Sequence, residues 1–229
     1  SLKVKHHLFS EVGKDNVGVK TIKILKKEKI KFHVLKSKIV STLKERLFIK
    51  NKQVFRNDFE YNSKNSTTSF KISNQIKRDD IVVISDYQKG LINKNFMDRL
   101  RKKNCTIFVD PKNRPEIFKN AFLVKPNMEK FEEWCGKFSE KKAFNLLYKM
   151  NWHWLVVSNN KNGIFVFNKY GQKNFYKVNY VKNPNVIGAG DILFSCIIKK
   201  YLDNLNIFTC VELASYATTK CVSKKKSER

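Results

Sequence analysis

The residues best suited to chemistry are the Gly-Ala-Gly-Asp sequence 188–191, which precedes an apolar run of helical character. Small residues at a helix start let a ligand approach backbone N–H donors, and the helix dipole adds to their attraction for an anion. A carboxylate on the first turn, here Asp191, could act as a general base beside a bound phosphate. These residues predict a phosphoryl-transfer site. The alternative, which they leave open, is a glycine-rich loop with an ordinary first-turn aspartate.

Four apolar runs are each followed by polar residues that could complete such a site. The runs cover residues 81–84, 105–109, 121–124 and 154–157, and they are typical of buried parallel strands. Helical spacing occurs at 95–103, 128–134, 140–150, 190–202 and 207–222. Strands that alternate with helices predict an α/β fold with a mostly parallel sheet. Ligands of such sheets bind outside the carboxyl ends of the strands, where the chain places Asp86, Lys89, Asp110, Lys112, Asn127 and Ser158.

The segments outside this pattern are mostly strand-like. We expect a strand over residues 2–12, a turn at 13–18 and a helix over 19–29. Further strands are predicted at 32–35, 39–49 and 54–61, the last two joined as a hairpin by the polar turn 51–53. Residues 62–68 are predicted to form a polar loop, and 163–168 with 174–178 an antiparallel pair.

Composition places the chain among globular proteins with a large basic charge. Hydrophobic residues make up 41% and aromatic residues 13% of the 229 residues, enough for a folded core. The net charge is +27, but only seven of the 47 basic residues are arginine, and lysines are spread along the whole chain. Nucleic-acid-binding proteins favour arginine for bidentate contacts. We therefore expect no dedicated nucleic-acid role, and keep a basic nucleic-acid-binding module as the alternative that the charge suggests.

Cysteine and histidine positions give no sign of a metal site. The five cysteines show no CxxC spacing and lie mostly in apolar segments, which indicates reduced core residues of a cytoplasmic protein. The four histidines lack metal-ligand spacing, so no direct metal ligand is assigned. No apolar run reaches membrane-spanning length and no signal peptide is recognisable, so we expect no membrane association.

Five segments resemble, in order, the motifs of one enzyme family. Residues 56–60 (RNDFE) are similar to an RxDFE segment, 85–90 (SDYQKG) to an SDYxKG loop, 109–112 to VDPK, 125–132 (KPNMEKFE) to TPNxxEFE, and 188–191 to GAGD. With these motifs the chain resembles the ribokinase-like, phosphofructokinase-B type carbohydrate kinases over nearly its whole length. The first three motifs make it most similar to the D-glycero-D-manno-heptose-7-phosphate kinase domain of ADP-heptose synthesis.

The resemblance implies a three-layer α/β sandwich with a mostly parallel central sheet and a small β lid. It also implies that the protein uses ATP and Mg²⁺ to phosphorylate a hydroxyl of a sugar or sugar phosphate, heptose 7-phosphate in the most similar subfamily. Asp191 matches the catalytic base, and Gly188, Ala189 and Gly190 match the anion hole. The matching ATP-binding residues are Asn127, Met128, Glu129, Lys130, Ser158, Asn160 and Gly163. The substrate-binding residues are Arg56, Asp86, Lys89, Asp110 and Lys112, with solvated surface lysine as the alternative for Lys89 and Lys112.

The chain departs from the family pattern at several positions. Lys130 stands where the family has a glutamate beside the position that organises Mg²⁺, which reverses the local charge. Residues 185–187 (Asn-Val-Ile) stand where Asp-x-Thr precedes GAGD. Asn160 replaces a glycine of the nucleotide loop, a mild change because asparagine tolerates left-handed backbone. The family's opening strand and glycine-rich sugar-binding segment are expected to precede Ser1.

We therefore expect one kinase domain over residues 1–229, N-terminally incomplete, with residues 30–61 as the lid-like β region and the remainder as the α/β core. Its expected partners are ATP, a sugar phosphate and a second copy bound through the lid. Two functions stay open beside the nucleic-acid alternative. The first is an active sugar kinase. The second, suggested by Lys130 and residues 185–187, is a decayed kinase fold that only binds nucleotide or sugar phosphate.

Overall fold

The computed structural model describes residues 4–49, 52–60, 68–179, 181 and 188–223. Their contacts divide the chain into two compact units. The first unit comprises residues 1–4, 78–87 and 101–229, and the second comprises residues 5–77 and 88–100. The expectation of one kinase domain over the whole chain stays a prediction.

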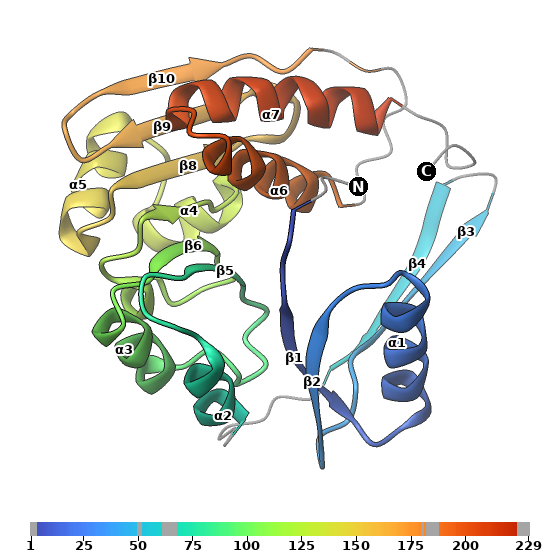
Figure 1. Cartoon of the computed structure of the whole chain (residues 1–229). Helices are drawn as coiled ribbons and strands as arrows, with labels where there is room; N and C mark the ends of the chain where they lie inside the picture. Colours follow the sequence, from blue (N-terminus) through green and yellow to red (C-terminus); the bar gives the residue numbers. More distant parts are fainter. Residues whose placement is uncertain (1–3, 50–51, 61–67, 180, 182–187, 224–229) are drawn as a thin grey trace. The chain divides into compact units, whose positions relative to one another are not determined.

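A six-stranded sheet forms the centre of the first unit (Figure 1). Its strands are β5 (Ile81–Ser85), β6 (Thr106–Asp110), β7 (Leu123–Val124), β8 (Trp154–Ser158), β9 (Ile164–Asn168) and β10 (Lys173–Tyr176), in the order β10-β9-β8-β7-β6-β5. Strands β5 to β8 are parallel, whereas β9 and β10 are antiparallel to their neighbours. The mostly parallel sheet is thereby confirmed, and its aligned carboxyl ends lie where the sequence placed the site.

Helices cover both faces of this sheet. Helices α6 (Ala189–Leu202) and α7 (Ile207–Val222) form a core with Ile164 and Val166 of β9. The alternate residues of β9, Phe165 and Phe167, point to the other face, which carries α4 (Met128–Cys135) and α5 (Glu140–Met150). Side chains of successive strand residues leave opposite faces, so a strand covered on both sides is apolar throughout. The three layers follow from this pattern.

The predicted elements of the first unit are confirmed with boundary shifts of one or two residues. Strand β5 differs in burial, because it lies at the edge of the sheet that the described residues form, and Ile81 and Val83 are 41% and 49% exposed. The expectation of a fully buried strand is therefore wrong for β5. Cys196 and Cys210 are buried between the last two helices, and burial raises the pKa of the Cys210 thiol to about 11. None of the helices in the described residues is long and apolar enough to cross a bilayer.

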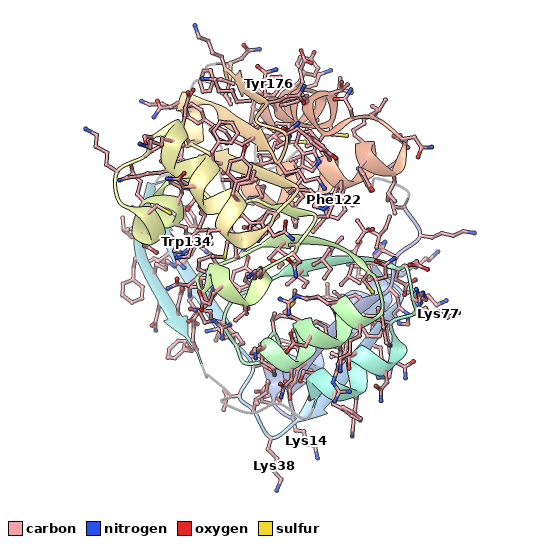
Figure 2. All side chains as sticks on the ribbon, turned by 90° about the vertical axis from the view of Figure 1, so that its left-hand side faces the viewer. Lys14, Lys38, Lys77, Phe122, Trp134 and Tyr176 are labelled. Atoms are coloured by element: carbon pink, nitrogen blue, oxygen red, sulfur yellow. The ribbon has the colours of Figure 1, made fainter. Side chains whose placement is uncertain are left out.

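The second unit is built from two small sheets and short helices. Its elements are β1 (Leu8–Gly13), α1 (Asn16–Lys27), β2 (Phe32–Ser37), β3 (Leu43–Ile49), β4 (Lys52–Phe59), α2 (Thr68–Gln75) and most of α3 (Lys94–Lys102). Strands β1 and β2 pair in parallel, with α1 as their connection, and β3 and β4 form an antiparallel hairpin. Lys14, Lys38 and Lys77 point outward from its ribbon, which matches the dispersed lysines of the sequence (Figure 2).

Helix α1 begins earlier than the sequence predicts because Asp15 caps it. The Asp15 carboxylate accepts the N–H of Gly18 at 2.8 Å and the N–H of Ser41 at 2.7 Å. These two hydrogen bonds lower the pKa of Asp15. An aspartate at this position satisfies N–H donors that the helix cannot pair internally. The predicted turn over 13–18 therefore shrinks to the residues around Asp15.

Three expectations for the second unit are corrected. The turn over 51–53 is wrong, because Lys52 and Gln53 already pair with Ile49 and Phe48. The lid region 30–61 is too wide, because β2 pairs with β1 and only β3 and β4 form the hairpin. Thr68 begins α2, a helix that the sequence reasoning missed; the rest of the predicted loop, residues 62–67, lies outside the described residues. Helix α2 is short and mostly polar, so its single buried apolar residue, Ile72, gave no clear period.

Two tryptophans offer a test of the core of the first unit. The fully buried Trp152 donates its indole N–H to Phe118 O at 2.8 Å, whereas the half-buried Trp134 donates to the exposed Asn113 side chain at 3.1 Å. We expect Trp152→Phe to lower the free energy of unfolding by about 2 kcal/mol, because a buried carbonyl loses its donor. Trp134→Phe is expected to cost less than about 0.5 kcal/mol, because water replaces the indole. Equal losses in urea titrations would contradict this packing.

Candidate active site

The carboxyl ends of β5 and β6 bring two predicted substrate-binding residues together. Ser85 pairs with Asp110, and the Asp86 N–H donates to Asp110 O at 3.0 Å. The Asp86 side chain is only 2% exposed, and its Oδ2 lies 3.4 Å from Nη2 of Arg114. A buried carboxylate needs such a cationic partner. Asp86 is thus held rigidly beside Asp110.

Arg114 is a residue that the sequence reasoning missed. Its backbone is left-handed, with φ of 57°, which is uncommon for a residue other than glycine. This geometry places the guanidinium, whose side chain is 36% exposed, over the buried Asp86. An arginine between Asn113 and Pro115 in a loop after a strand is the signal that could have identified it.

A second ion pair links β6 to the residue that follows β7. Lys125 Nζ lies 3.0 Å from Asp110 Oδ2, with the two side chains 3% and 18% exposed. The Lys125 N–H donates to Val109 O at 2.9 Å, so the sheet fixes both backbones. Lys125 was part of the KPN motif but was not predicted as a site residue. Its position directly after a buried apolar run was the available signal.

The start of α6 lies next to this ion pair. Gly188, with φ of 75°, is the N-cap, and Asp191 is the acidic residue of the first turn, as predicted. A Cβ on Gly190 would lie 3.9 Å from Lys125 Nζ, so the buried ammonium lies beside the start of α6. The first N–H groups of a helix have no partner within it. The N–H groups of the helix start and the Lys125 ammonium are therefore hydrogen-bond donors with positive charge that lie side by side.

Tyr87 connects Asp191 to the ends of β5 and β6. Burial raises the pKa of the Tyr87 phenol, and the negative charges of Asp191 and Asp110 raise it further. Both carboxylates therefore lie within electrostatic range of the same hydroxyl group.

The two predicted ATP-binding segments are neighbours. Asn127 pairs with Ser158 in a parallel bridge, and the Ser158 N–H donates to Pro126 O at 3.1 Å. Asn127 is also the N-cap of α4, where its Oδ1 accepts the Lys130 N–H at 2.9 Å. Met128 and Glu129 follow on the first turn of α4.

The predicted nucleotide loop after β8 has the expected backbone. Asn160 has φ of 45°, in agreement with the expectation that asparagine tolerates this position. Gly163 closes the loop by accepting the Asn159 N–H at 2.8 Å, with φ of 120°. A Cβ at Gly163 would lie 2.5 Å from Cζ of Phe175 on β10. The loop therefore requires a glycine for both its torsion angle and its packing.

Lys130 reverses the charge where the family motif has a glutamate. Its Nζ donates to Pro111 O at 2.8 Å, at the end of β6. Burial lowers the pKa of Lys130, Asp110 opposes this shift, and Lys125 and Lys112 reinforce it. Among the described residues, no three histidine, cysteine, aspartate or glutamate side chains are grouped to hold a metal ion.

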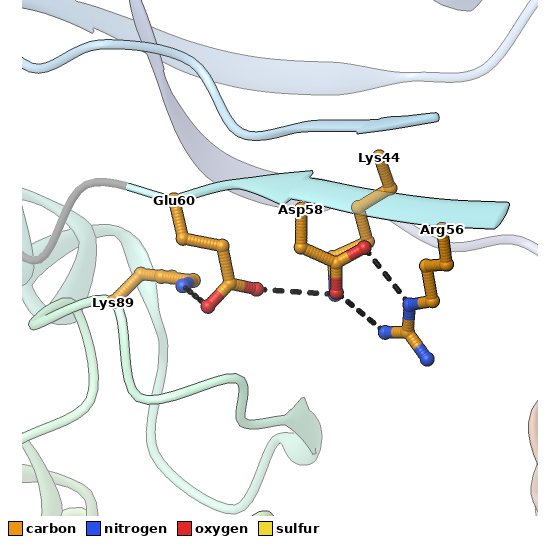
Figure 3. Close-up of polar contacts among 5 residues, drawn as sticks. All are labelled: Lys44, Arg56, Asp58, Glu60 and Lys89. Carbon is orange, nitrogen blue, oxygen red and sulfur yellow. Dashed lines mark hydrogen bonds and ion pairs between the residues drawn. The ribbon is translucent and has the colours of Figure 1, made fainter. Parts of the chain in front are cut away.

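Arg56 and Lys89 are held in an ion-pair network of the second unit (Figure 3). Arg56 binds Asp58 with both Nε and Nη2, at 2.9 and 2.5 Å, and Lys89 Nζ lies 2.5 Å from Glu60. Lys44 joins the two pairs, at 3.9 Å from Asp58 and 3.3 Å from Glu60. Lys89 is therefore an ion-paired side chain rather than a solvated surface lysine.

An open groove of about 480 Å³ lies between β10 and the second half of α7. Aromatic and hydroxyl side chains line it, among them Phe175, Tyr176, Ser215, Tyr216 and Thr219. Because α6 and α7 are packed helices joined by a short loop, the second half of α7 runs beside the start of α6 (Figure 1). The sequence reasoning missed this groove, because its residues come from elements that carry no motif.

The first unit thus brings most predicted residues to one edge of its sheet. Asp86 bonds to Asp110, Asn127 pairs with Ser158, and Asp191 follows the glycine that lies beside Lys125. Lys112 is half-buried two residues after Asp110. Arg56 and Lys89 belong to the second unit. The altered residues 185–187 lie outside the described residues.

Comparison with known proteins gives one family over almost the whole chain. The family model described as pfkB family carbohydrate kinase matches residues 1–228. The bifunctional protein HldE of Nitratiruptor sp. is 26% identical over 95% of this chain, and HldE of Haemophilus influenzae (strain PittEE) is 27% identical over 98%. The chain spans about half of these relatives, 49% and 50%. An uncharacterized sugar kinase of Buchnera aphidicola is 30% identical over 81% of this chain and 63% of its own length.

Solved structures with the same fold include a phosphofructokinase and a ribokinase. Phosphofructokinase-2 from Escherichia coli, in complex with potassium, matches 99% of this chain and 78% of its own with a TM-score of 0.82 and 15% identity. Ribokinase from Giardia lamblia matches 96% of this chain and 78% of its own with a TM-score of 0.77 and 12% identity. At these identities the likeness concerns the fold.

Two glycines with left-handed backbone test the nucleotide loop. Gly171→Ala pays the torsional cost alone, because its φ is 81° and the nearest atom to a Cβ is 3.8 Å away. Gly163 also has a positive φ, 120°, and the Cβ of an alanine there would in addition collide with Phe175. We expect Gly171→Ala to cost about 1 kcal/mol of stability and Gly163→Ala about 2 kcal/mol more. Urea denaturation of both variants measures the difference, and equal costs would disagree with the packing of Gly163.

Proposed function

The chain belongs to the pfkB family of carbohydrate kinases, and from this membership we propose that it transfers the γ-phosphoryl group of ATP to a hydroxyl of a sugar or sugar phosphate. The ribokinase-like fold expected from the motifs is confirmed by the solved structures. The proposed acceptor is heptose 7-phosphate, as the RxDFE, SDYxKG and VDPK segments suggest. Matches to HldE proteins over nearly the whole chain support this choice.

One observation carries the proposal. The predicted base, the amide donors of a helix start, a buried lysine and the predicted ATP-binding segment are gathered at the carboxyl ends of β6, β7 and β8. Lys125 lies between Asp110 and Gly190, and Asn127 lies beside Ser158. Phosphoryl transfer depends on positioning and charge stabilisation more than on covalent catalysis, and these groups supply both.

The reaction assigned to this site has few steps. Asp191 accepts the proton of the acceptor hydroxyl as its oxygen attacks the γ-phosphorus, and the bond to the β-phosphate oxygen breaks, which leaves ADP. The N–H groups of Gly188, Ala189 and Gly190 and the Lys125 ammonium stabilise the negative charge of the transferring group. Asp191 then holds the proton taken from the hydroxyl.

The groove beside α7 suits the nucleoside of ATP. Its volume of about 480 Å³ is in the range of small-molecule sites, and aromatic faces such as Tyr216 can stack on a base. Asn127 to Lys130, Ser158, Asn160 and Gly163 are proposed to contact the remainder of the nucleotide. An ATP molecule laid along this path would present its phosphates to the start of α6.

Mg²⁺ is implied by the family resemblance, and the residues present do not fit a carboxylate-organised metal site. Lys130 occupies the expected glutamate position, and Asp110 is already paired with Lys125. Mg²⁺ often binds through one or two carboxylates, substrate phosphates and water. The side chains on this edge of the sheet offer it little beyond the nucleotide itself.

Arg56 and Lys89 are proposed as contacts of a sugar-phosphate substrate. Both are cationic, and their carboxylate partners keep them in place in the second unit. A phosphate monoester carries more negative charge than a carboxylate and accepts bidentate hydrogen bonds from arginine. We therefore expect a substrate phosphate to replace Asp58 as the partner of Arg56.

The first test concerns the proposed base. We expect Asp191→Asn to lower kcat about a thousandfold with ATP and a heptose 7-phosphate acceptor, because the amide cannot accept the proton. Asp203→Asn, at the other end of α6, serves as the control because its carboxylate pairs with Lys199 and Lys200 of the helix end. Coupled ADP release measures both variants. Turnover by Asp191→Asn at the unaltered rate would remove the assigned base.

A second candidate function is nucleotide or sugar-phosphate binding without transfer. The charge reversal at Lys130 favours it, because it alters the surroundings of the phosphates. Calorimetric binding of ATP, combined with the absence of ADP release across a panel of sugar phosphates, would select this function. Turnover with any member of the panel would select the kinase.

We also propose that two copies pair through the β3–β4 hairpin. Leu43 faces Phe59 and Leu47 faces Phe55 across the hairpin, so these four side chains share one face. Their exposed fractions run from 37% to 56%. The opposite face carries Lys44, Arg56 and Asp58. A two-stranded sheet with one apolar face gains stability when that face is covered.

A charge on this face tests the pairing. We expect Phe55→Lys to convert a dimer into a monomer, because a lysine in the centre of an apolar interface is costly to desolvate. Tyr170→Lys is the control, because Tyr170 is 76% exposed in the turn between β9 and β10. Light scattering after size exclusion reports the mass. A wild-type monomer, or a dimer unaffected by Phe55→Lys, would rule out this interface.

A further inference from the structure

Two lysine ammonium groups lie at the end of β6. Lys125 is paired with Asp110. Lys130 Nζ donates to Pro111 O at 2.8 Å, at the end of the same strand. Lys112, Lys125, Asp110 and the exposed Glu133 all lie within electrostatic range of Lys130. Lys130 donates to a carbonyl rather than to a carboxylate, so an anion could neutralise its ammonium charge.

Lys130 occupies a position that opposes its charge. It lies on the first turn of α4, where the helix dipole favours anions and disfavours cations. It is also half-buried, and a charge in such a place loses hydration. Its hydrogen bond to Pro111 O holds the ammonium at this place. A residue that breaks local rules in this way is typical of a functional site.

We propose that Lys125 and Lys130 bind the polyphosphate of ATP directly, so that this chain binds the nucleotide without requiring a divalent cation. The inference rests on the proposed function, in which ATP is the phosphoryl donor. In family members with a glutamate at this position, Mg²⁺ supplies positive charge to the phosphates. In this chain, Lys130 supplies that charge itself. Lysine is a compact point charge suited to phosphate oxygens.

An extended anion fits this arrangement better than a single phosphate. Lys125 lies between Asp110 and the start of α6, with its Nζ 3.9 Å from the position of a Gly190 side chain. Lys130 also lies at the end of β6. The amides of α6, Lys125 and Lys130 thus supply donors from three segments around this strand end. A polyphosphate has oxygens for all three.

Calorimetry with ATP, once in excess EDTA and once with Mg²⁺, tests the inference on the purified chain. We expect the wild type to bind metal-free ATP within a few-fold of its affinity for MgATP. Lys130→Gln should weaken the binding of metal-free ATP about tenfold and Lys130→Glu about a hundredfold, with smaller effects on MgATP. Lys130→Arg should restore the metal-free affinity.

Matched controls separate this effect from net charge and from misfolding. Lys149→Gln and Lys149→Glu make the same charge changes at an exposed position of α5 and should leave both affinities unaltered. Circular dichroism shows whether each variant is folded. Binding of MgATP alone by the wild type, or equal losses of both affinities in Lys130→Glu, overturns the inference and leaves the kinase proposal intact. A folded wild type that binds neither form overturns both.

Discussion

The buried ion pair of Lys125 and Asp110 sets the geometry from which the rest of the site is built. An uncompensated charge in such a place costs several kcal/mol, so neither side chain can leave its partner freely. Both backbones are already fixed by the pairing of β6 and β7. The ammonium of Lys125 therefore stands at one defined point, close to the start of α6. Asp86, held by Arg114 at the end of the neighbouring strand, extends the same rigid edge.

The two units organise their charges in different ways. In the second unit, cations and carboxylates alternate from Arg56 through Asp58, Lys44 and Glu60 to Lys89 (Figure 3). Each charge in that network has an opposite neighbour, and exposed pairs of this kind add little stability. In the first unit, Lys125 pairs with Asp110, whereas Lys130 donates to the carbonyl of Pro111. The network of the second unit orients side chains, and Lys130 of the first unit has a charge that an external anion could neutralise.

The sequence predicted the fold where the period of apolar residues was clear. Helices α5 and α7 have the expected bounds, and the left-handed backbone of Asn160 followed from its side chain. The prediction from sequence failed for α2, which is short and polar. It also failed for the turn after β3, because Lys52 and Gln53 are polar yet paired in the hairpin. Motif spacing located Asp110, Asn127 and Asp191. It could not locate Arg114 or the groove along α7, because contacts between distant segments define them.

The two-faced hairpin also bears on how the protein folds. An isolated pair of strands has only marginal stability in water. The exposed apolar face of β3 and β4 adds nothing to that stability until another surface covers it. If a second copy covers that face, association and local folding become one equilibrium. Dilution would then unravel the strand that carries Arg56 and Asp58 before the sheet of the first unit is affected. Substrate affinity would become a function of protein concentration.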